Sequence, residues 1–130
     1  MAKDPLCTIG AHTIHHHALA KLSVEDAMAE IMGSMARIES ETGQRPRFLA
    51  YPYGDPLSAG EREFDLARAA GIEAAVTTRK GLIFPGHGEK LTALPRVSIN
   101  GGYQQLRYLD VLLSGTAFAL WAGILQGNTA

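Results

Sequence analysis

The sequence has little of what marks several large classes of protein. Its 130 residues include one cysteine, Cys7, so it offers neither a disulfide framework nor a cysteine-based zinc site. Twelve Lys and Arg against 13 Asp and Glu give a net charge of -1, which provides no basic surface for nucleic acid or anionic membranes. No stretch approaches the roughly 18 apolar residues of a membrane span. We therefore expect neither a nucleic-acid nor a membrane partner.

The start of the chain also lacks the apolar segment of a secretory signal, since it reads Met-Ala-Lys-Asp-Pro. As written, the sequence predicts a cytoplasmic protein, or an extracytoplasmic one if a longer gene carries an upstream signal. The length fits one compact domain over residues 1–130.

Four short apolar runs have the length and composition of buried strands. Helical patterns and loops rich in glycine and proline separate them. This order predicts parallel strands joined by crossover helices, and hence an α/β fold. The expected strands are residues 6–11, 47–52, 73–78 and 95–99.

Three segments carry helical periodicity. Over residues 23–42 apolar side chains recur three or four positions apart, and Gly43 is a stop signal. A capping box of Ser58 and Glu61 predicts the start of a second helix. The third segment, residues 103–122, is apolar on most faces, which predicts a helix that some other surface must cover.

Four of the five histidines cluster in Gly10-Ala11-His12-Thr13-Ile14-His15-His16-His17. His12 follows the first expected strand, and α/β folds bind ligands at the carboxyl ends of their strands. If the chain turns helical there, His16 lies on the same side and both imidazoles can bind one ion. His15 and His17 then face elsewhere. The alternative is a solvated loop that happens to be rich in histidine.

This stretch resembles the His-[Ser/Thr]-x-x-His metal motif of the polysaccharide deacetylases, carbohydrate esterase family 4. The segment Phe48-Leu49-Ala50-Tyr51-Pro52-Tyr53-Gly54 resembles the groove motif of that family, and residues 69–96 are similar to its late barrel strands. The resemblance covers most of the chain but only the C-terminal two thirds of the family's domain. It implies a partial (β/α)-barrel of the polysaccharide deacetylase type that lacks the first strands.

The resemblance also implies a function, the metal-dependent hydrolysis of N-acetyl or O-acetyl groups on sugars. The implied substrate is an acetylated oligo- or polysaccharide, and the implied cofactor is a divalent metal, with zinc expected and cobalt or nickel as alternatives. His12 and His16 match the histidine ligands, and the backbone N–H of Tyr53 matches a donor to the oxyanion. The other candidates are Tyr51, Pro52, Tyr53 and Gly54 for the substrate groove and Arg96 for a catalytic positive charge.

Several family features are missing from the sequence. Family members open with a Thr-Phe-Asp-Asp-Gly-like strand that supplies the general base and the carboxylate ligand, whereas the first expected strand here already leads into the histidines. Asp55 and Asp110 do not sit in matching positions, and Ala50 and Tyr51 occupy the region of the groove arginine. A Leu-x-x-His general acid is not visible either. Because a positioned base contributes roughly 10²–10⁴-fold, we expect a truncated domain with little or no activity by itself.

Two other functions remain open. A non-catalytic carbohydrate-binding or assembly module would keep the groove without the chemistry. The second alternative is a metal-binding domain in which all four clustered histidines bind zinc or nickel opportunistically. Too few strands to close a barrel also predict open sheet edges, so we expect a homo-oligomer. The alternative is a monomer in which residues 103–122 fold back over the sheet.

Overall fold

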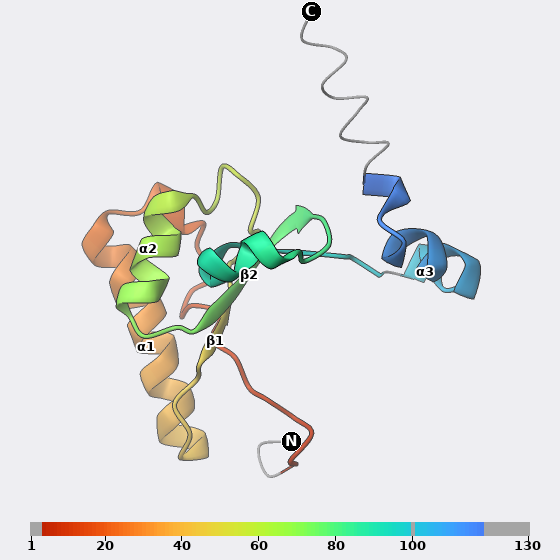
Figure 1. Cartoon of the computed structure of the whole chain (residues 1–130). Helices are drawn as coiled ribbons and strands as arrows, with labels where there is room; N and C mark the ends of the chain where they lie inside the picture. Colours follow the sequence, from red (N-terminus) through yellow and green to blue (C-terminus); the bar gives the residue numbers. More distant parts are fainter. Residues whose placement is uncertain (1–3, 100, 119–130) are drawn as a thin grey trace, which may run out of the picture.

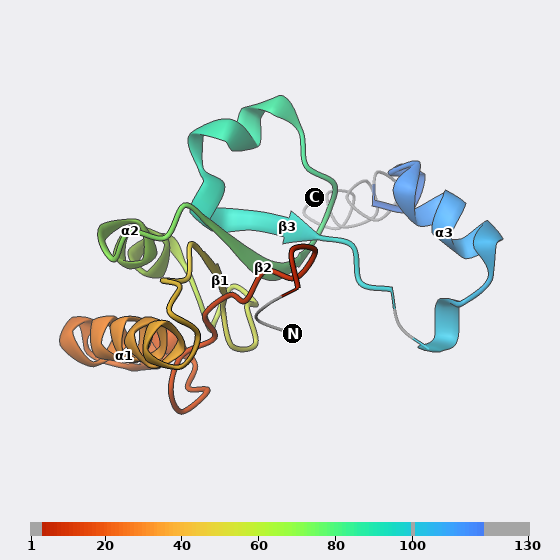
Figure 2. The ribbon, with the colours of Figure 1, turned by 90° about the horizontal axis from the view of Figure 1, so that it is seen from below.

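The computed structural model describes residues 4–99 and 101–118 and contains a small parallel sheet with two helices on one side (Figures 1 and 2). The strands are β1 (Phe48–Ala50), β2 (Ala74–Lys80) and β3 (Leu94–Arg96), in the order β1-β2-β3. Both strand pairs are parallel. The predicted α/β class is confirmed, although β2 ends two residues later than expected and β3 lies at 94–96 instead of 95–99.

The segment predicted as the first strand, residues 6–11, joins the sheet only at its end. Ala11 forms a parallel bridge with Leu49, in which the Ala11 N–H donates to the Phe48 carbonyl oxygen (2.8 Å). The Ala50 N–H donates to the Ala11 carbonyl oxygen (3.0 Å). A strand needs a partner along its length, and β1 has only three residues, so the prediction of a full strand is wrong.

Helix α1 (Val24–Thr42) begins and ends as the sequence predicts. The hydroxyl of Ser23 accepts a hydrogen bond from the Asp26 N–H (3.0 Å) and donates one to the Asp26 carboxylate (2.9 Å). Gly43 terminates the helix in the left-handed conformation (φ 72°), which glycine adopts without steric cost. Two local signals in the sequence therefore define where this helix begins and where it ends.

Helix α2 (Glu61–Ala69) begins by a different cap from the one predicted. Gly60 is the capping residue, and its N–H donates to the carboxylate of Glu63 (2.7 Å). Ser58 lies two residues before this cap, and its hydroxyl donates to Asp55 (2.7 Å). The predicted capping box of Ser58 and Glu61 is wrong, because the helix begins at Glu61 with Gly60 as its cap.

Helices α1 and α2 cover one face of the sheet, and the hydrophobic core lies between them (Figure 2). Ile31 and Met35 of α1 and Ala67 of α2 are fully buried there. No helix among the described residues covers the opposite face of the sheet, the open face, which forms a mostly apolar hollow of about 550 Å³. The side chains and backbone that line this hollow belong to Thr8, Gly10, Ala11, His12, Phe48, Leu49, Ala50, Ala74, Val76 and Leu94.

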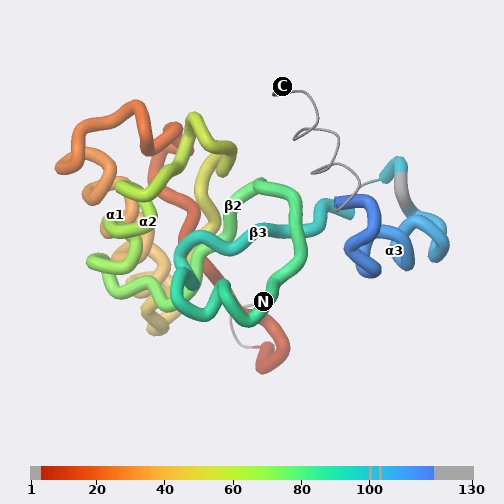
Figure 3. The backbone as a smooth tube through the Cα atoms, turned by 45° about the horizontal axis from the view of Figure 1, so that its top comes forward, coloured from red at the N-terminus to blue at the C-terminus, as the bar shows by residue number. Residues whose placement is uncertain are grey.

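Helix α3 (Leu106–Leu113) stands apart from the sheet and from the other two helices (Figures 1 and 3). No residue of α3 is buried, and Leu106 is 78% exposed. The prediction of one continuous helix over residues 103–122 is wrong, because Gly115 is left-handed (φ 76°) and interrupts it. Residues 119–122 of that prediction lie outside the described part of the chain. No helix among the described residues is long and apolar enough to cross a membrane.

Candidate metal centre

Three aromatic side chains meet where the chain leaves the carboxyl ends of the strands. His12 follows the bridge residue Ala11, and Tyr53 lies three residues beyond β1. The ring centroids of His12 and His16 are 4.8 Å apart, and those of His16 and Tyr53 are 5.0 Å apart. All three side chains are exposed. The structure thus brings together the two histidines that the sequence predicts as metal ligands.

The ring of His12 is held in one orientation by the sheet. Its Nδ1 lies 2.7 Å from the carbonyl oxygen of Ala50, and a carbonyl oxygen only accepts hydrogen bonds. Nδ1 therefore donates this hydrogen bond, and Nε2 is the ring nitrogen left for a metal ion. A second ring nitrogen bonded to a backbone carbonyl is the usual arrangement of a metal-binding histidine.

His16 reaches His12 through an irregular turn and not through the predicted helical one. Thr13 (φ 64°) and His16 (φ 59°) both adopt the left-handed conformation. This conformation is rare for residues other than glycine, and particularly for a β-branched residue such as threonine. The hydroxyl of Thr13 accepts a hydrogen bond from the His16 N–H (3.1 Å), which closes the turn. The two histidines are near each other, but for a different reason from their expected i, i+4 spacing.

His15 is held away from His12 and His16 by α1. Its Nδ1 lies 2.5 Å from the carboxylate of Glu30 on α1. The rings of His15 and His17 stack on each other, with their centroids 5.6 Å apart. This arrangement agrees with the expectation that His15 and His17 face elsewhere.

Tyr53 is placed in the left-handed conformation (φ 60°) by a fixed loop. Its carbonyl oxygen accepts a hydrogen bond from the Thr78 hydroxyl (2.6 Å), and the next carbonyl, that of Gly54, accepts one from the Thr78 N–H (3.0 Å). A β-carbon on Gly54 would lie 2.7 Å from the Thr78 nitrogen, so only glycine fits there. The N–H of Tyr53 makes no hydrogen bond to the described part of the chain.

The neighbours of Tyr53 in the groove motif, Tyr51, Pro52 and Gly54, are buried. The side chain of Tyr51 is only 3% exposed and donates its hydroxyl to the Thr92 carbonyl oxygen (2.8 Å). Burial, and secondly the charge of Glu63, raises the pKa of Tyr51. Pro52 and Gly54 are buried as well, so Tyr53 is the one residue of this motif whose side chain is exposed at the groove. Tyr51 and Pro52 thus present little surface to a ligand, and their predicted contact with substrate stays a prediction.

Among the described residues, no carboxylate joins the two histidines as a third ligand. Both oxygens of Asp55 accept hydrogen bonds, one from the Ser58 hydroxyl (2.7 Å) and one from the Leu57 N–H (2.8 Å). Asp110 belongs to α3, away from the sheet (Figure 1). Within residues 4–99 and 101–118, no three His, Cys, Asp or Glu side chains converge on a common point.

Two hollows flank the histidine pair. His12 lines the apolar hollow on the open face of the sheet, and His16 lines a separate open groove of about 500 Å³. Arg96, the predicted catalytic charge, ends β3 as an exposed residue and lines neither hollow, so its role stays a prediction. The groove is lined by His16, His17, Ala18, Lys21, Leu22, Tyr53, Asp55 and Ser58.

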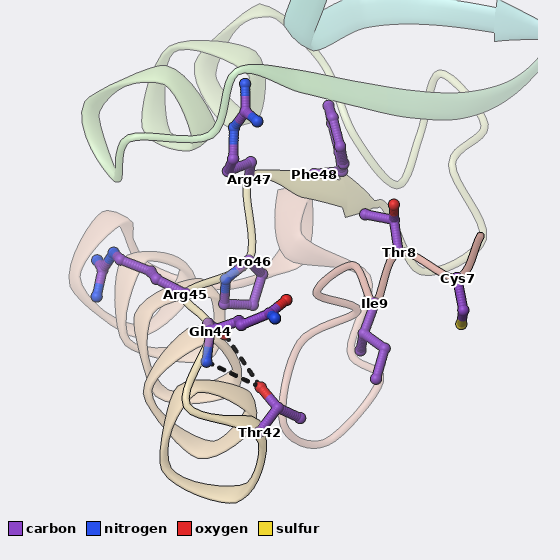
Figure 4. A pocket seen from close by; sticks show the side chains of 9 residues that line it. All are labelled: Cys7, Thr8, Ile9, Thr42, Gln44, Arg45, Pro46, Arg47 and Phe48. Atoms are coloured by element: carbon purple, nitrogen blue, oxygen red, sulfur yellow. Dashed lines mark hydrogen bonds between the residues drawn. The ribbon is translucent and has the colours of Figure 1, made fainter. Parts of the chain in front are cut away.

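A third hollow, of about 220 Å³, lies at the amino end of β1, away from the histidines (Figure 4). Its wall includes a turn in which the Gln44 N–H donates to the Thr42 hydroxyl (3.2 Å). The two arginines of the wall bind carboxylates elsewhere, Arg45 that of Glu39 and Arg47 that of Glu73. No histidine, aspartate or glutamate lines this hollow, so the candidate chemistry stays at the carboxyl ends of the strands.

Two residues that sequence reasoning missed hold the histidine turn from α1. Ser34 accepts a hydrogen bond from the His12 N–H (3.3 Å), and Glu30 accepts bonds from the turn itself. Both are buried, with 6% and 7% of their surface exposed. Their signal in the sequence is a pair of polar residues, four apart, within the apolar pattern of a helix.

Comparison with known proteins gives one family and several similar structures. Residues 1–75 match the family described as Polysaccharide deacetylase. Curated protein sequences give no match. The Streptococcus pyogenes deacetylase PplD, solved in complex with acetate, superposes with a TM-score of 0.70 at 22% identity, over 79% of this chain and 43% of that one.

Two further structures show the same fold. IcaB from Ammonifex degensii has a TM-score of 0.63 at 21% identity, over 83% of this chain and 46% of that one. A polysaccharide deacetylase from Bacillus cereus has a TM-score of 0.58 at 26% identity, over 69% of this chain and 27% of that one. The chain therefore spans less than half the length of each of these three structures.

Proposed function

Because the chain belongs to the polysaccharide deacetylase family, we propose that His12 and His16 bind a divalent metal ion and that the adjacent groove receives an acetylated oligo- or polysaccharide. The supporting observation is the approach of the two imidazole rings, whose centroids are 4.8 Å apart. Nδ1 of His12 is bonded to the Ala50 carbonyl oxygen, which leaves Nε2 for a metal ion. Imidazole nitrogens suit zinc, cobalt and nickel, and we expect zinc.

The groups around the pair fit the chemistry of acetyl hydrolysis. A divalent ion there would supply a Lewis acid that polarises an acetyl carbonyl. The free N–H of Tyr53 would donate a hydrogen bond to the oxyanion that forms from that carbonyl. The ring of Tyr53 is 57% exposed beside His16 and would pack against a sugar.

Metal binding is tested by isothermal titration of the chain with zinc. We expect weak binding, because two protein ligands are fewer than the three or four of most zinc sites. His12→Ala and His16→Ala should remove it, whereas His17→Ala, the matched control from the same segment, should leave it unchanged. Wild-type affinity in both ligand variants would contradict the proposal. A loss in His17→Ala as well would favour opportunistic binding by the cluster.

A second candidate function is a carbohydrate-binding or assembly module without catalysis. The absence of a converging carboxylate among the described residues favours it, because the family's reaction needs a base. We accordingly expect little or no acetate release by this chain from chitooligosaccharides or acetylated xylan in the presence of zinc, cobalt or nickel. Retained binding of these sugars without turnover would support the module. Turnover in the usual enzyme range of roughly 1–10³ s⁻¹ would show that the chain does supply a base.

A further inference from the structure

Glu30 of α1 holds the backbone of the turn that presents His16. One oxygen of its carboxylate accepts hydrogen bonds from the N–H groups of Ile14 and His15, each 2.9 Å long. The other lies 2.5 Å from Nδ1 of His15. Three donors of one short turn therefore converge on a single buried side chain. Within the described residues, this side chain forms its hydrogen bonds with Ile14 and His15 and not with either candidate ligand.

The carboxylate stays ionised in this position. Burial raises the pKa of Glu30, but the hydrogen bonds from His15 and Ile14 outweigh burial and lower the pKa overall. Charge-assisted hydrogen bonds are stronger than neutral ones, so the ionised form holds the two N–H groups more firmly than an amide would.

The rest of the α1 surface is shaped for the same turn. Ser34, one helical turn after Glu30, accepts a hydrogen bond from the His12 N–H. Between them, Gly33 has no β-carbon, which leaves space for the end of the Ile14 side chain, whose Cδ1 lies 2.3 Å from where that carbon would be. Helix α1 thus contacts residues on both sides of Thr13, whose left-handed conformation needs such support.

From these contacts we propose that Glu30 is a positioning residue, which fixes the turn over residues 13–16 so that the ring of His16 meets the rings of His12 and Tyr53. The effect of Glu30 on metal binding rests on the proposed function, since a displaced His16 would no longer share an ion with His12. Removal of a partner that orients a metal ligand typically costs about 10–100-fold in metal affinity.

The experiment compares Glu30→Ala and Glu30→Gln with Glu63→Gln. Glu63 is the matched control, because it is also a buried helical carboxylate that accepts a backbone hydrogen bond, in its case at the start of α2. The first measurement is the NMR spectrum of the imidazole of His16, recorded without metal and assigned with His16→Ala. We expect the His16 signals to shift in Glu30→Ala as the ring leaves its two aromatic neighbours, and to stay in place in Glu63→Gln.

The second measurement is zinc affinity by titration, in which Glu30→Ala should bind about 10–100-fold more weakly than the wild type. Glu30→Gln keeps an acceptor oxygen for the turn, so its zinc affinity should lie between those of Glu30→Ala and the wild type. If Glu30→Ala does not fold, Glu30→Gln takes its place in both measurements. Unmoved His16 signals, or wild-type zinc affinity, would overturn the proposal. If the wild-type chain binds no zinc, the proposed function fails, but the His16 signals still decide the role of Glu30.

Discussion

Asp55 stabilises the loop after Tyr53 through two hydrogen bonds to one carboxylate. The hydrogen bond from the Ser58 hydroxyl, followed by that from the Leu57 N–H, lowers the pKa of Asp55 below its ordinary value of 3.8. A carboxylate whose pKa is lower in the folded state stabilises the fold above its unfolded pKa. This contribution is lost as the pH falls through the folded value.

We therefore predict that Asp55→Asn lowers the free energy of unfolding at neutral pH and that the difference from wild type shrinks below about pH 4. Urea unfolding of both proteins between pH 7 and pH 3 measures this. Glu89→Gln, which removes an exposed carboxylate in the loop before β3, is the control. A difference in the free energy of unfolding between Asp55→Asn and wild type that does not change with pH would contradict a stabilising role of the Asp55 carboxylate.

The sequence predicts His12 and His16 because their motif is short and local. It does not predict the burial of Tyr51, because that depends on Phe64 and Thr92, which are distant along the chain. The support from Glu30 is missed for the same reason, since no local pattern shows which buried helical carboxylate faces a loop. Contacts between distant segments determine the burial and the roles of these residues, and a single sequence does not show such contacts.

At the scale of elements, α1 depends on its N-terminal cap. The hydroxyl of Ser23 satisfies the Asp26 N–H, one of the donors that a helix leaves unpaired at its start. Ser23→Ala should lower the free energy of unfolding by about 1 kcal/mol. Urea unfolding measures it, with Ser40→Ala on the exposed side of the same helix as the control. Equal stability of Ser23→Ala and wild type would contradict the role of the cap.

Elements differ in how far local signals define them. Both ends of α1 follow from the sequence because Ser23 and Gly43 act within one helical turn. The start of α2 does not, because the Ser58 hydroxyl bonds to Asp55 and the helix begins two residues later than predicted, after Gly60. For α3 the apolar pattern predicts that the helix needs cover but not which surface supplies it.

At the scale of the whole molecule, the open face of the sheet leaves apolar groups in contact with water. Phe48 is 39% exposed there, and Ala50, Ala74 and Val76 are half-buried. Helix α3, with Val111 and Leu113 more than half exposed, adds a second apolar surface. Surfaces of this kind usually mark an interface.

We predict that the chain associates with itself, most simply as a two-fold dimer. Sedimentation equilibrium at micromolar concentration should then give twice the chain mass of 13.9 kDa. Val76→Asp, within the open face, should weaken the dimer, whereas Val24→Asp at the start of α1 should not. A single species of 13.9 kDa at every concentration would favour the monomer instead.

The left-handed conformations of His16 and Tyr53 have a consequence for how this protein tolerates sequence change. Each such residue other than glycine costs folding free energy, of order 1–3 kcal/mol, and neither side chain is buried in return. Glycine at either position would relieve that cost. A survey that scored cellular abundance and ligand binding separately should find glycine at 16 and 53 tolerated in the first score. It should find glycine at 16 rejected for metal binding and glycine at 53 rejected for sugar binding. Selection for stability alone would thus erode this site, and only selection for what the site does would keep it.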